Sequence, residues 1–165
     1  MTVVELVIVI AILAVLASLA VAYLLRARVA GNEAAALGSL RTINTAQFAY
    51  AVQCGNGHYA TSLLILGNKP NGYASAFLNE DLGSEVSPAR SGYTITMSPG
   101  SGNAAAGNDC TGNPTWLSYY VAAKPDEAGR TGTRAFATNQ GGAIFQLQGG
   151  TPPVEPFSPP AVPAR

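Results

Sequence analysis

The sequence LVIVIAILAVLASLAVAYLL occupies residues 6–25, and its only polar side chains are those of Ser18 and Tyr23. A helix of this length extends about 30 Å, the thickness of the hydrocarbon core of a bilayer. Arg26 and Arg28 follow directly, as cations do at the interfacial end of a membrane helix. A cleavable secretory signal needs a basic segment before the apolar run and small residues after it. Neither pattern flanks this run, so we expect the helix to remain in the working protein.

The chain as a whole is neutral and poor in charge. Nine basic and nine acidic residues give a formal net charge of zero, and charged residues make up 11% of the sequence. Nucleic-acid binding depends on clustered Lys and Arg, so we expect no nucleic-acid partner. A surface without net charge favours packing against copies of the same chain, because long-range repulsion is absent.

One carboxylate, that of Glu5, stands directly before the apolar run. A carboxylate at the edge of a membrane segment is costly unless it stays at the headgroups or finds a cation. The first alternative needs only an interfacial position. The second predicts a partner, and the nearest candidate is the amino group of Met1, from the same chain or from a neighbouring copy.

The opening MTVVELVIVIAI, residues 1–12, resembles the mature N-terminus of type IV pilins and pseudopilins, which are made with a class III signal. Members of that family have an apolar first residue, often Thr at the second position, Glu at the fifth and then a long apolar run. Residues 35–46 and 55–60 also resemble a subset of pilin-like proteins. The main resemblance extends to about residue 30.

The resemblance implies an assembly site at the N-terminus. A prepilin peptidase would cut just before Met1, whose amine would then be N-methylated, and Glu5 would neutralise the N-terminus of an adjacent subunit. The helix would sit in the inner membrane before the assembly machinery draws it into an extracellular filament on the cell surface. The residues expected to pack in the filament core are Val4, Leu6, Ile8, Ile12, Leu16 and Leu19.

Two positions depart from the family pattern. Many members carry Gly at the fourteenth position and Pro at the twenty-second, where this chain has Ala14 and Ala22. Both changes remove helix breakers, so we predict a more continuous helix over residues 14–22. The first residue is Met1 rather than the commoner Phe.

The helix is predicted to continue to Gln53, because residues 26–53 lack Pro and are rich in Ala, Leu, Arg and Glu. The helical period predicts one face that packs on the rest of the protein. That face comprises Leu37, Leu40, Asn44, Phe48, Ala51 and Val52. The residues predicted to lie elsewhere and to meet neighbouring subunits are Ile43, Ala46 and Tyr50.

Cys54 and Cys110 are the only cysteines. They are too few for a zinc site, and the single His58 does not complete one, so no metal site is expected. In a chain that crosses or leaves a membrane they favour a disulfide. The alternative is two unpaired thiols.

The remainder predicts a small head of α+β class, in which an antiparallel sheet of about four strands lies against the helix. The predicted strands cover residues 93–97, 116–123, 133–138 and 143–148, and the last two flank the hairpin signal NQGG. Short helices are predicted over residues 61–66 and 74–82, and a long loop over 98–114. The chain thus divides into a membrane or filament-core helix (1–28), an amphipathic helix (29–53), a head (54–148) and a tail (149–165).

The tail reads GGTPPVEPFSPPAVPAR, and its prolines exclude a helix or a central strand. We expect an extended segment, either a disordered linker or a strap along a neighbouring head.

No nucleophile elbow, phosphate loop, haem-attachment motif or metal cluster is present in the sequence, so we expect no enzyme activity and no cofactor. The preferred hypothesis is a major pilin-like structural subunit that forms a homopolymer. The alternatives are a pseudopilin of a type II secretion system and a membrane-anchored binding module.

Overall fold

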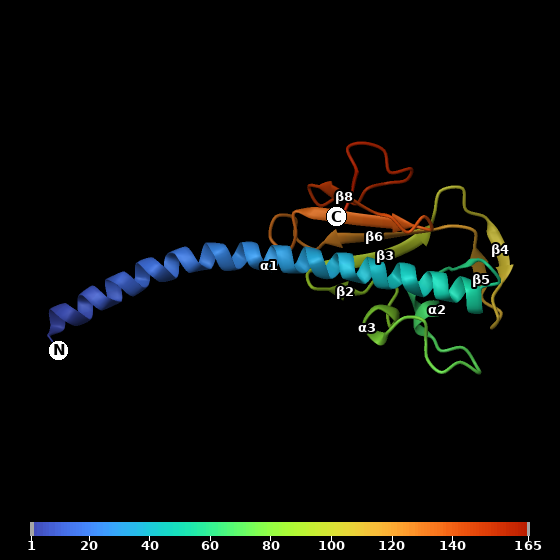
Figure 1. Ribbon diagram of the computed structural model, residues 1–165, viewed down its shortest axis with the longest axis horizontal. Helices are drawn as coiled ribbons and strands as arrows, with labels where there is room; N and C mark the ends of the chain where they lie inside the picture. Colours follow the sequence, from blue (N-terminus) through green and yellow to red (C-terminus); the bar gives the residue numbers. More distant parts are fainter. Residues whose placement is uncertain (1, 165) are drawn as a thin grey trace.

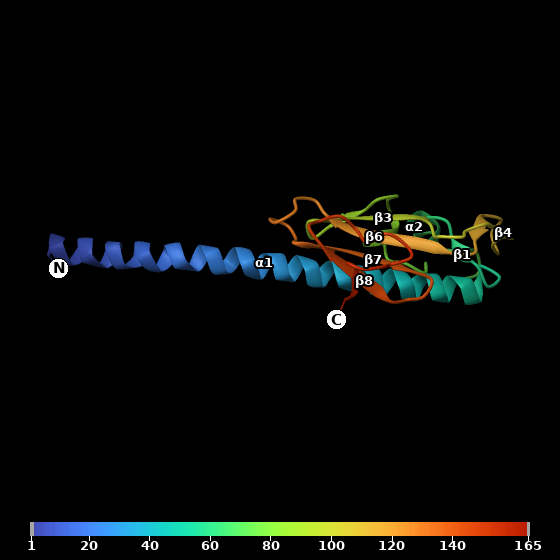
Figure 2. The same ribbon diagram turned by 90° about the horizontal axis from the view of Figure 1, so that it is seen from above.

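A single helix, α1 (Val3–Gln53), forms the stalk of the molecule and runs along one side of the head (Figures 1 and 2). The computed structural model describes residues 2–164, with only the backbone described over residues 19–22. With 51 residues, α1 is about 77 Å long. It is unbroken across residues 14–22, as the absence of Gly and Pro predicts.

The two halves of α1 have different surroundings. Among the side chains that the structure describes, those from residue 2 to residue 28 are exposed, and the first buried one is Glu33. From there to Cys54 the helix packs against the head. The molecule is therefore a head with an apolar helix that projects from it without any protein cover.

The main sheet of the head has six antiparallel strands in the order β2-β3-β6-β7-β8-β9. The predicted hairpin of β7 and β8 is present, and Gly142 in its turn has a φ of 75°, which favours glycine. The strands are β2 (Ala89–Arg90), β3 (Tyr93–Pro99), β6 (Tyr119–Pro125), β7 (Arg134–Asn139), β8 (Ile144–Gln148) and β9 (Val162–Pro163).

A smaller sheet, in the order β1-β5-β4, closes the end of the head beyond α1. Its strands are β1 (Tyr59–Ala60), β4 (Ala105–Asn108) and β5 (Pro114–Trp116). Two short helices, α2 (Leu63–Gly67) and α3 (Glu80–Gly83), pack together so closely that a Cβ on Gly67 would meet backbone atoms of Gly83 at 2.6 Å. That contact requires glycine.

The α+β class and the antiparallel sheet are confirmed, but the prediction of about four strands is too low. The additional strands β1, β2, β4, β5 and β9 have two to four residues each, too few for an alternating pattern to be visible. The predicted loop over 98–114 contains β4, and the predicted strand over 116–123 is divided between β5 and β6. Of the two predicted helices, α2 is present and is capped by Ser62, whereas the second is reduced to α3.

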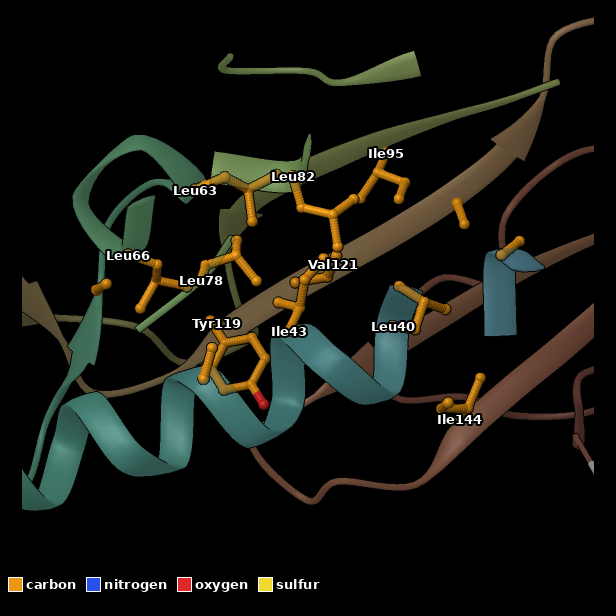
Figure 3. Packing of buried hydrophobic residues seen from close by; sticks show 14 of the residues in the cluster. Leu40, Ile43, Leu63, Leu66, Leu78, Leu82, Ile95, Tyr119, Val121 and Ile144 are labelled. Atoms are coloured by element: carbon orange, nitrogen blue, oxygen red, sulfur yellow. The ribbon is translucent and has the colours of Figure 1, made fainter. Parts of the chain in front are cut away.

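The face of α1 that packs on the head is only partly the predicted one, because Leu37, Leu40 and Ala51 are buried as predicted but two other members of that face are not. Phe48 and Val52 are 71% and 69% exposed, whereas Ile43, Ala46 and Tyr50 are buried. Figure 3 shows Ile43 of α1 pointing toward Val121 of β6. The central residues of this core are Leu40, Ile43, Leu63, Leu66, Leu78, Leu82, Ile95, Tyr119, Val121 and Ile144.

A buried polar residue, Gln47, explains the error. It lies in the middle of the true buried face and is fully buried. Its side chain donates to the Ala60 carbonyl at 3.1 Å and accepts from the Ala60 amide at 2.9 Å, so it satisfies the end of β1 as another strand would. Because Gln47 is polar, the spacing of the apolar residues alone predicts a packing face that is rotated about the helix axis away from Gln47.

The tail does not extend freely from the head but packs on it. Residues 150–164 fold back over the face of the main sheet that lies opposite α1 and end in β9, which pairs with β8 (Figure 1). No helix forms there, as its prolines predict.

Candidate assembly interface

The projecting part of α1 is an apolar surface without cover. Among the described residues, α1 is the one helix long and apolar enough to cross a membrane, and its apolar stretch has no buried side chain. Val4 is 67% exposed and Leu6 is 49% exposed. The other described residues predicted to pack in a filament core, Ile8, Ile12 and Leu16, are also exposed, and the side chain of Leu19 lies outside the described residues.

Glu5 has a local role at the start of this helix. Thr2 is the N-cap of α1, and its hydroxyl accepts a hydrogen bond from the Glu5 amide at 3.3 Å. The Glu5 carboxylate in turn accepts from the Thr2 amide at 2.7 Å, which completes a capping box. The arrangement satisfies two backbone donors that a helix start otherwise leaves free.

This contact bears on the predicted pairing of Glu5 with an N-terminal amine. Met1 lies outside the described residues, so the ion pair and the N-methylation remain predictions. The capping box places the Glu5 carboxylate beside Thr2, at the tip of the helix and exposed to any second molecule that approaches it.

No family model, curated protein or solved structure matches this chain.

A partly buried ion pair fixes the head to the helix just beyond the apolar stretch. Glu33, which is 4% exposed, accepts from the Arg134 side chain at 2.6 Å and from the Thr133 amide and hydroxyl at 2.8 and 2.7 Å. Burial raises the pKa of Glu33, but these hydrogen bonds and the Arg134 charge outweigh it, so the pKa is lowered. Asn32 adds a bond to the Thr131 carbonyl at 2.9 Å.

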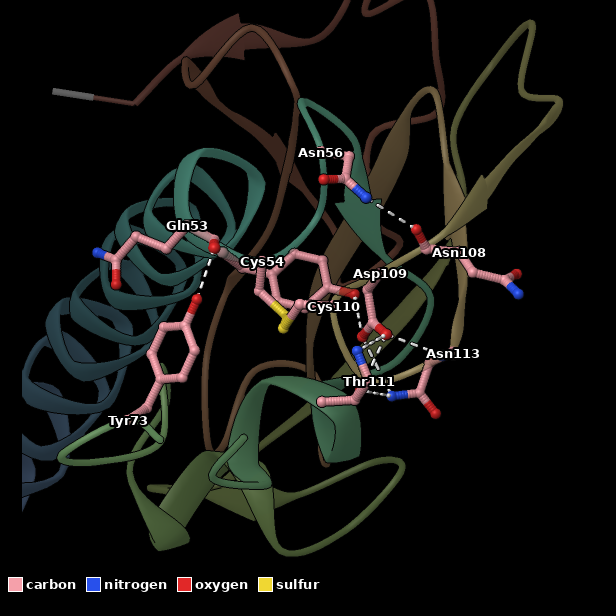
Figure 4. The surroundings of a disulfide bond; sticks show 10 residues. Gln53, Cys54, Asn56, Tyr73, Asn108, Asp109, Cys110, Thr111 and Asn113 are labelled. Carbon is pink, nitrogen blue, oxygen red and sulfur yellow. Dashed lines mark hydrogen bonds between the residues drawn. A yellow bond between two sulfur atoms is a disulfide. The ribbon is translucent and has the colours of Figure 1, made fainter. Parts of the chain in front are cut away.

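A disulfide between Cys54 and Cys110 fixes the other end of α1 (Figure 4), as one of the two alternatives for the cysteines predicts. The Cys110 amide also donates to the Cys54 carbonyl at 2.8 Å. The loop around Cys110 is thereby tied to Cys54, the residue that caps the C-terminal end of α1.

Asp109 organises the loop beside this disulfide. Its carboxylate accepts from the Tyr50 hydroxyl at 2.8 Å and from the amides of Thr111 and Asn113 at 2.8 Å each. Burial opposes ionisation of Asp109, but the bonds from Tyr50, Asn113 and Thr111 lower its pKa to about 2. Burial and the Asp109 charge raise the pKa of Tyr50, which therefore remains a neutral donor.

Acid is expected to destabilise the head through Asp109. The pKa of Asp109 is lower in the folded chain than its ordinary value of 3.8, so its contribution is complete above that value and is lost as the pH falls toward 2. The shift corresponds to about 2 kcal/mol. Glu33 adds a loss of the same sign, because its pKa is also lowered.

The measurement is denaturant unfolding of the full chain in mild detergent between pH 5 and pH 2, followed by the fluorescence of Trp116, the single tryptophan. Asp109→Asn is the matched control, because it keeps the shape but does not titrate, and its pH dependence should be shallower. Equal pH dependence in the two proteins would contradict the assignment.

The described part of the chain, residues 2–164, has no group of three or more His, Cys, Asp and Glu side chains placed to hold a metal ion.

The sequence indicates Glu5, the apolar helix and the cysteines, but the structure adds two features that the sequence analysis does not predict: the capping role of Thr2 and the ion pair of Glu33 and Arg134. The role of Thr2 can be predicted from the sequence, because Thr followed three residues later by Glu is the capping-box pattern. The ion pair cannot be predicted in this way, because its partners are 101 residues apart in the sequence.

Proposed function

We propose that this protein is the structural subunit of an extracellular filament and that it polymerises through the projecting half of α1. Before assembly the same helix would hold the subunit in the inner membrane, where a prepilin peptidase would process it. In the filament the helices would bundle in the centre and the heads would face outward.

The exposed apolar helix is the observation that carries this proposal. Residues 3–16 include bulky aliphatic side chains that are 49–79% exposed. Transfer of one such side chain from water to an apolar interior stabilises by about 1.5–3 kcal/mol. A protein that leaves the membrane must bury this surface again, and parallel copies of the same helix offer a cover of matching length.

The rigid attachment of the head supports the same function. The ion pair of Glu33 and the disulfide of Cys54 hold α1 at both ends of its buried half. A fixed orientation between helix and head lets every subunit enter a polymer with the same geometry, whereas a hinged head would not.

A membrane-anchored binding module and a pseudopilin are the alternatives. An anchor requires neither the carboxylate at position 5 nor a rigid link between helix and head. The pseudopilin differs only in the length and place of the filament, and electron microscopy of material sheared from the cell surface separates it from a long surface fibre.

Deletion of residues 1–28 is expected to give a soluble monomeric head that forms no fibres. The cut precedes Glu33, so the buried half of α1, its ion pair and the disulfide are all retained. The measurements are light scattering of the purified protein and electron microscopy under conditions in which the full chain forms fibres.

The control is the thermal unfolding of the truncated protein, which should remain cooperative. Fibres formed by the truncated protein would contradict the proposed interface. A full chain that stays in the membrane fraction and gives no sheared fibres would instead favour the anchor.

A further inference from the structure

The face of the main sheet opposite α1 is buried by the C-terminal tail. Tyr119 and Thr138 face α1, because their hydroxyls bond to Asn44 of that helix. Side chains alternate along a strand, so Tyr120 and Ala137 point to the other face. Ala137 is nevertheless fully buried, and Figure 1 shows the tail on this side of the sheet.

An aromatic stack and a hydrogen bond hold the tail on this face. The ring of Phe157 in the tail stacks on Phe145 of β8, with centroids 4.5 Å apart and an interplanar angle of 15°. It also lies against Tyr120 of β6, at 6.3 Å. The Tyr120 hydroxyl donates to the carbonyl of Pro153 at 2.6 Å.

Glu155 adds a polar attachment on the same side. Its carboxylate accepts from the side-chain amide of Asn139 at 2.5 Å and from the backbone amide of Ser101. Each of these contacts comes from a different part of the head, so the tail is seated in a specific position.

The end of the tail covers the outer edge of β8. In β9, Val162 pairs with Gln146 and Pro163 with Phe145, and the Ala164 amide donates to the Ile144 carbonyl at 2.8 Å. Since the Ala164 amide points to β8, the nitrogen of the preceding Pro163 points outward. A proline nitrogen has no proton, so the new edge of the sheet lacks a donor there.

The strand under this cover has the composition of an unprotected edge. The sequence IFQLQ of β8 is uncharged, and residues 135–154, which include the whole of β8, contain no charged residue. Exposed edges in other sheets are protected by charges or prolines, and uncharged strands of high β-propensity pair with one another when they are free. In this head the prolines are on the tail, and β8 has no protection of its own.

We propose that the C-terminal tail is a built-in cover that prevents β8 from pairing with β8 of a second copy. Without the tail, two heads join edge to edge about a two-fold axis, because an antiparallel pair of identical strands is self-complementary. This surface belongs to the head and is independent of the assembly proposed for α1.

The test compares the full chain with a chain that lacks residues 151–165, both in mild detergent, by size-exclusion chromatography with light scattering. We expect an approximately twofold higher protein mass for the shortened chain relative to the full chain. Hydrogen exchange should show that the amides of Ile144 and Gln146 stay protected in the larger species. A synthetic peptide of residues 151–165 should restore the original mass, and the same peptide with Phe157→Ala should not.

Gln148→Lys in the shortened chain tests whether a charge on β8 prevents the pairing of two heads. Gln148 is suitable because it is exposed at the end of β8 and lies beyond the residues that pair with β9. The added charge should restore the original mass. Should the shortened chain not fold, Phe157→Ala in the full chain carries the same expectation of a raised mass. The proposal is overturned if every folded variant keeps the mass of the full chain, or if association is reversed by neither the peptide nor the lysine.

Discussion

Replacing Glu5 by Gln is expected to leave few or no filaments, with normal membrane insertion. Gln serves at the third helical position of a capping box as well as Glu does, so the start of α1 should be unchanged. What is lost is the charge. In the proposed bundle a carboxylate is stable only beside a cation, and the nearest candidate is the N-terminal amine of a neighbouring copy. Electron microscopy and the yield of sheared filaments measure the effect.

Thr2→Ala is the matched control, because it removes the hydroxyl of the capping box and keeps the carboxylate. We expect a small loss of helix stability, about 1 kcal/mol, and filaments close to the wild-type amount. Wild-type assembly of Glu5→Gln would show that Glu5 is only a helix cap and an interfacial residue. The proposed function would then lose its main electrostatic argument.

Removing the disulfide with Cys54→Ser and Cys110→Ser is expected to lower the free energy of unfolding by about 4 kcal/mol. The bond joins two residues with a sequence separation of 56, and its loss frees the loop between them in the unfolded chain. The native contacts around it, including the bond from the Tyr73 hydroxyl to the Gln53 carbonyl at 2.5 Å, do not depend on the sulfur atoms.

Denaturant unfolding of the full chain in detergent, with and without reductant, measures this effect. The wild-type protein should lose stability on reduction, and the double serine variant should not respond. A change below about 1 kcal/mol on reduction would contradict the loop-entropy argument, because the remaining bonds around Asp109 would then hold the loop alone.

Much of the fold could be predicted because its strongest signals are local. The length of α1 follows from a long run without Pro, and the hairpin of β7 and β8 follows from NQGG between two alternating segments. Contacts between segments that are far apart in the sequence are harder to predict. Gln47 is buried because the end of β1 needs a partner for both its amide and its carbonyl, and no pattern within α1 indicates that need.

The candidate site likewise combines features that local sequence signals predict with contacts between distant segments that they do not. The apolar helix and Glu5 are evident in the first residues of the chain, and the spacing of Thr2 and Glu5 is that of a capping box. The tail is different. Its prolines exclude regular structure, but the place where it rests depends on the stacking of Phe157 on Phe145, two residues in separate segments whose meeting is decided by the finished sheet.

The two attachments of α1 also determine how the molecule would respond to tension. Glu33 and Cys54 are 21 positions apart in the sequence, so they hold the head at points about 32 Å apart along the helix axis. A pull along that axis would load the ion pair, the disulfide and the core between them at the same time, in shear. The head could not be peeled from the helix one contact at a time, and the link between helix and head would resist a mechanical force better than either attachment alone.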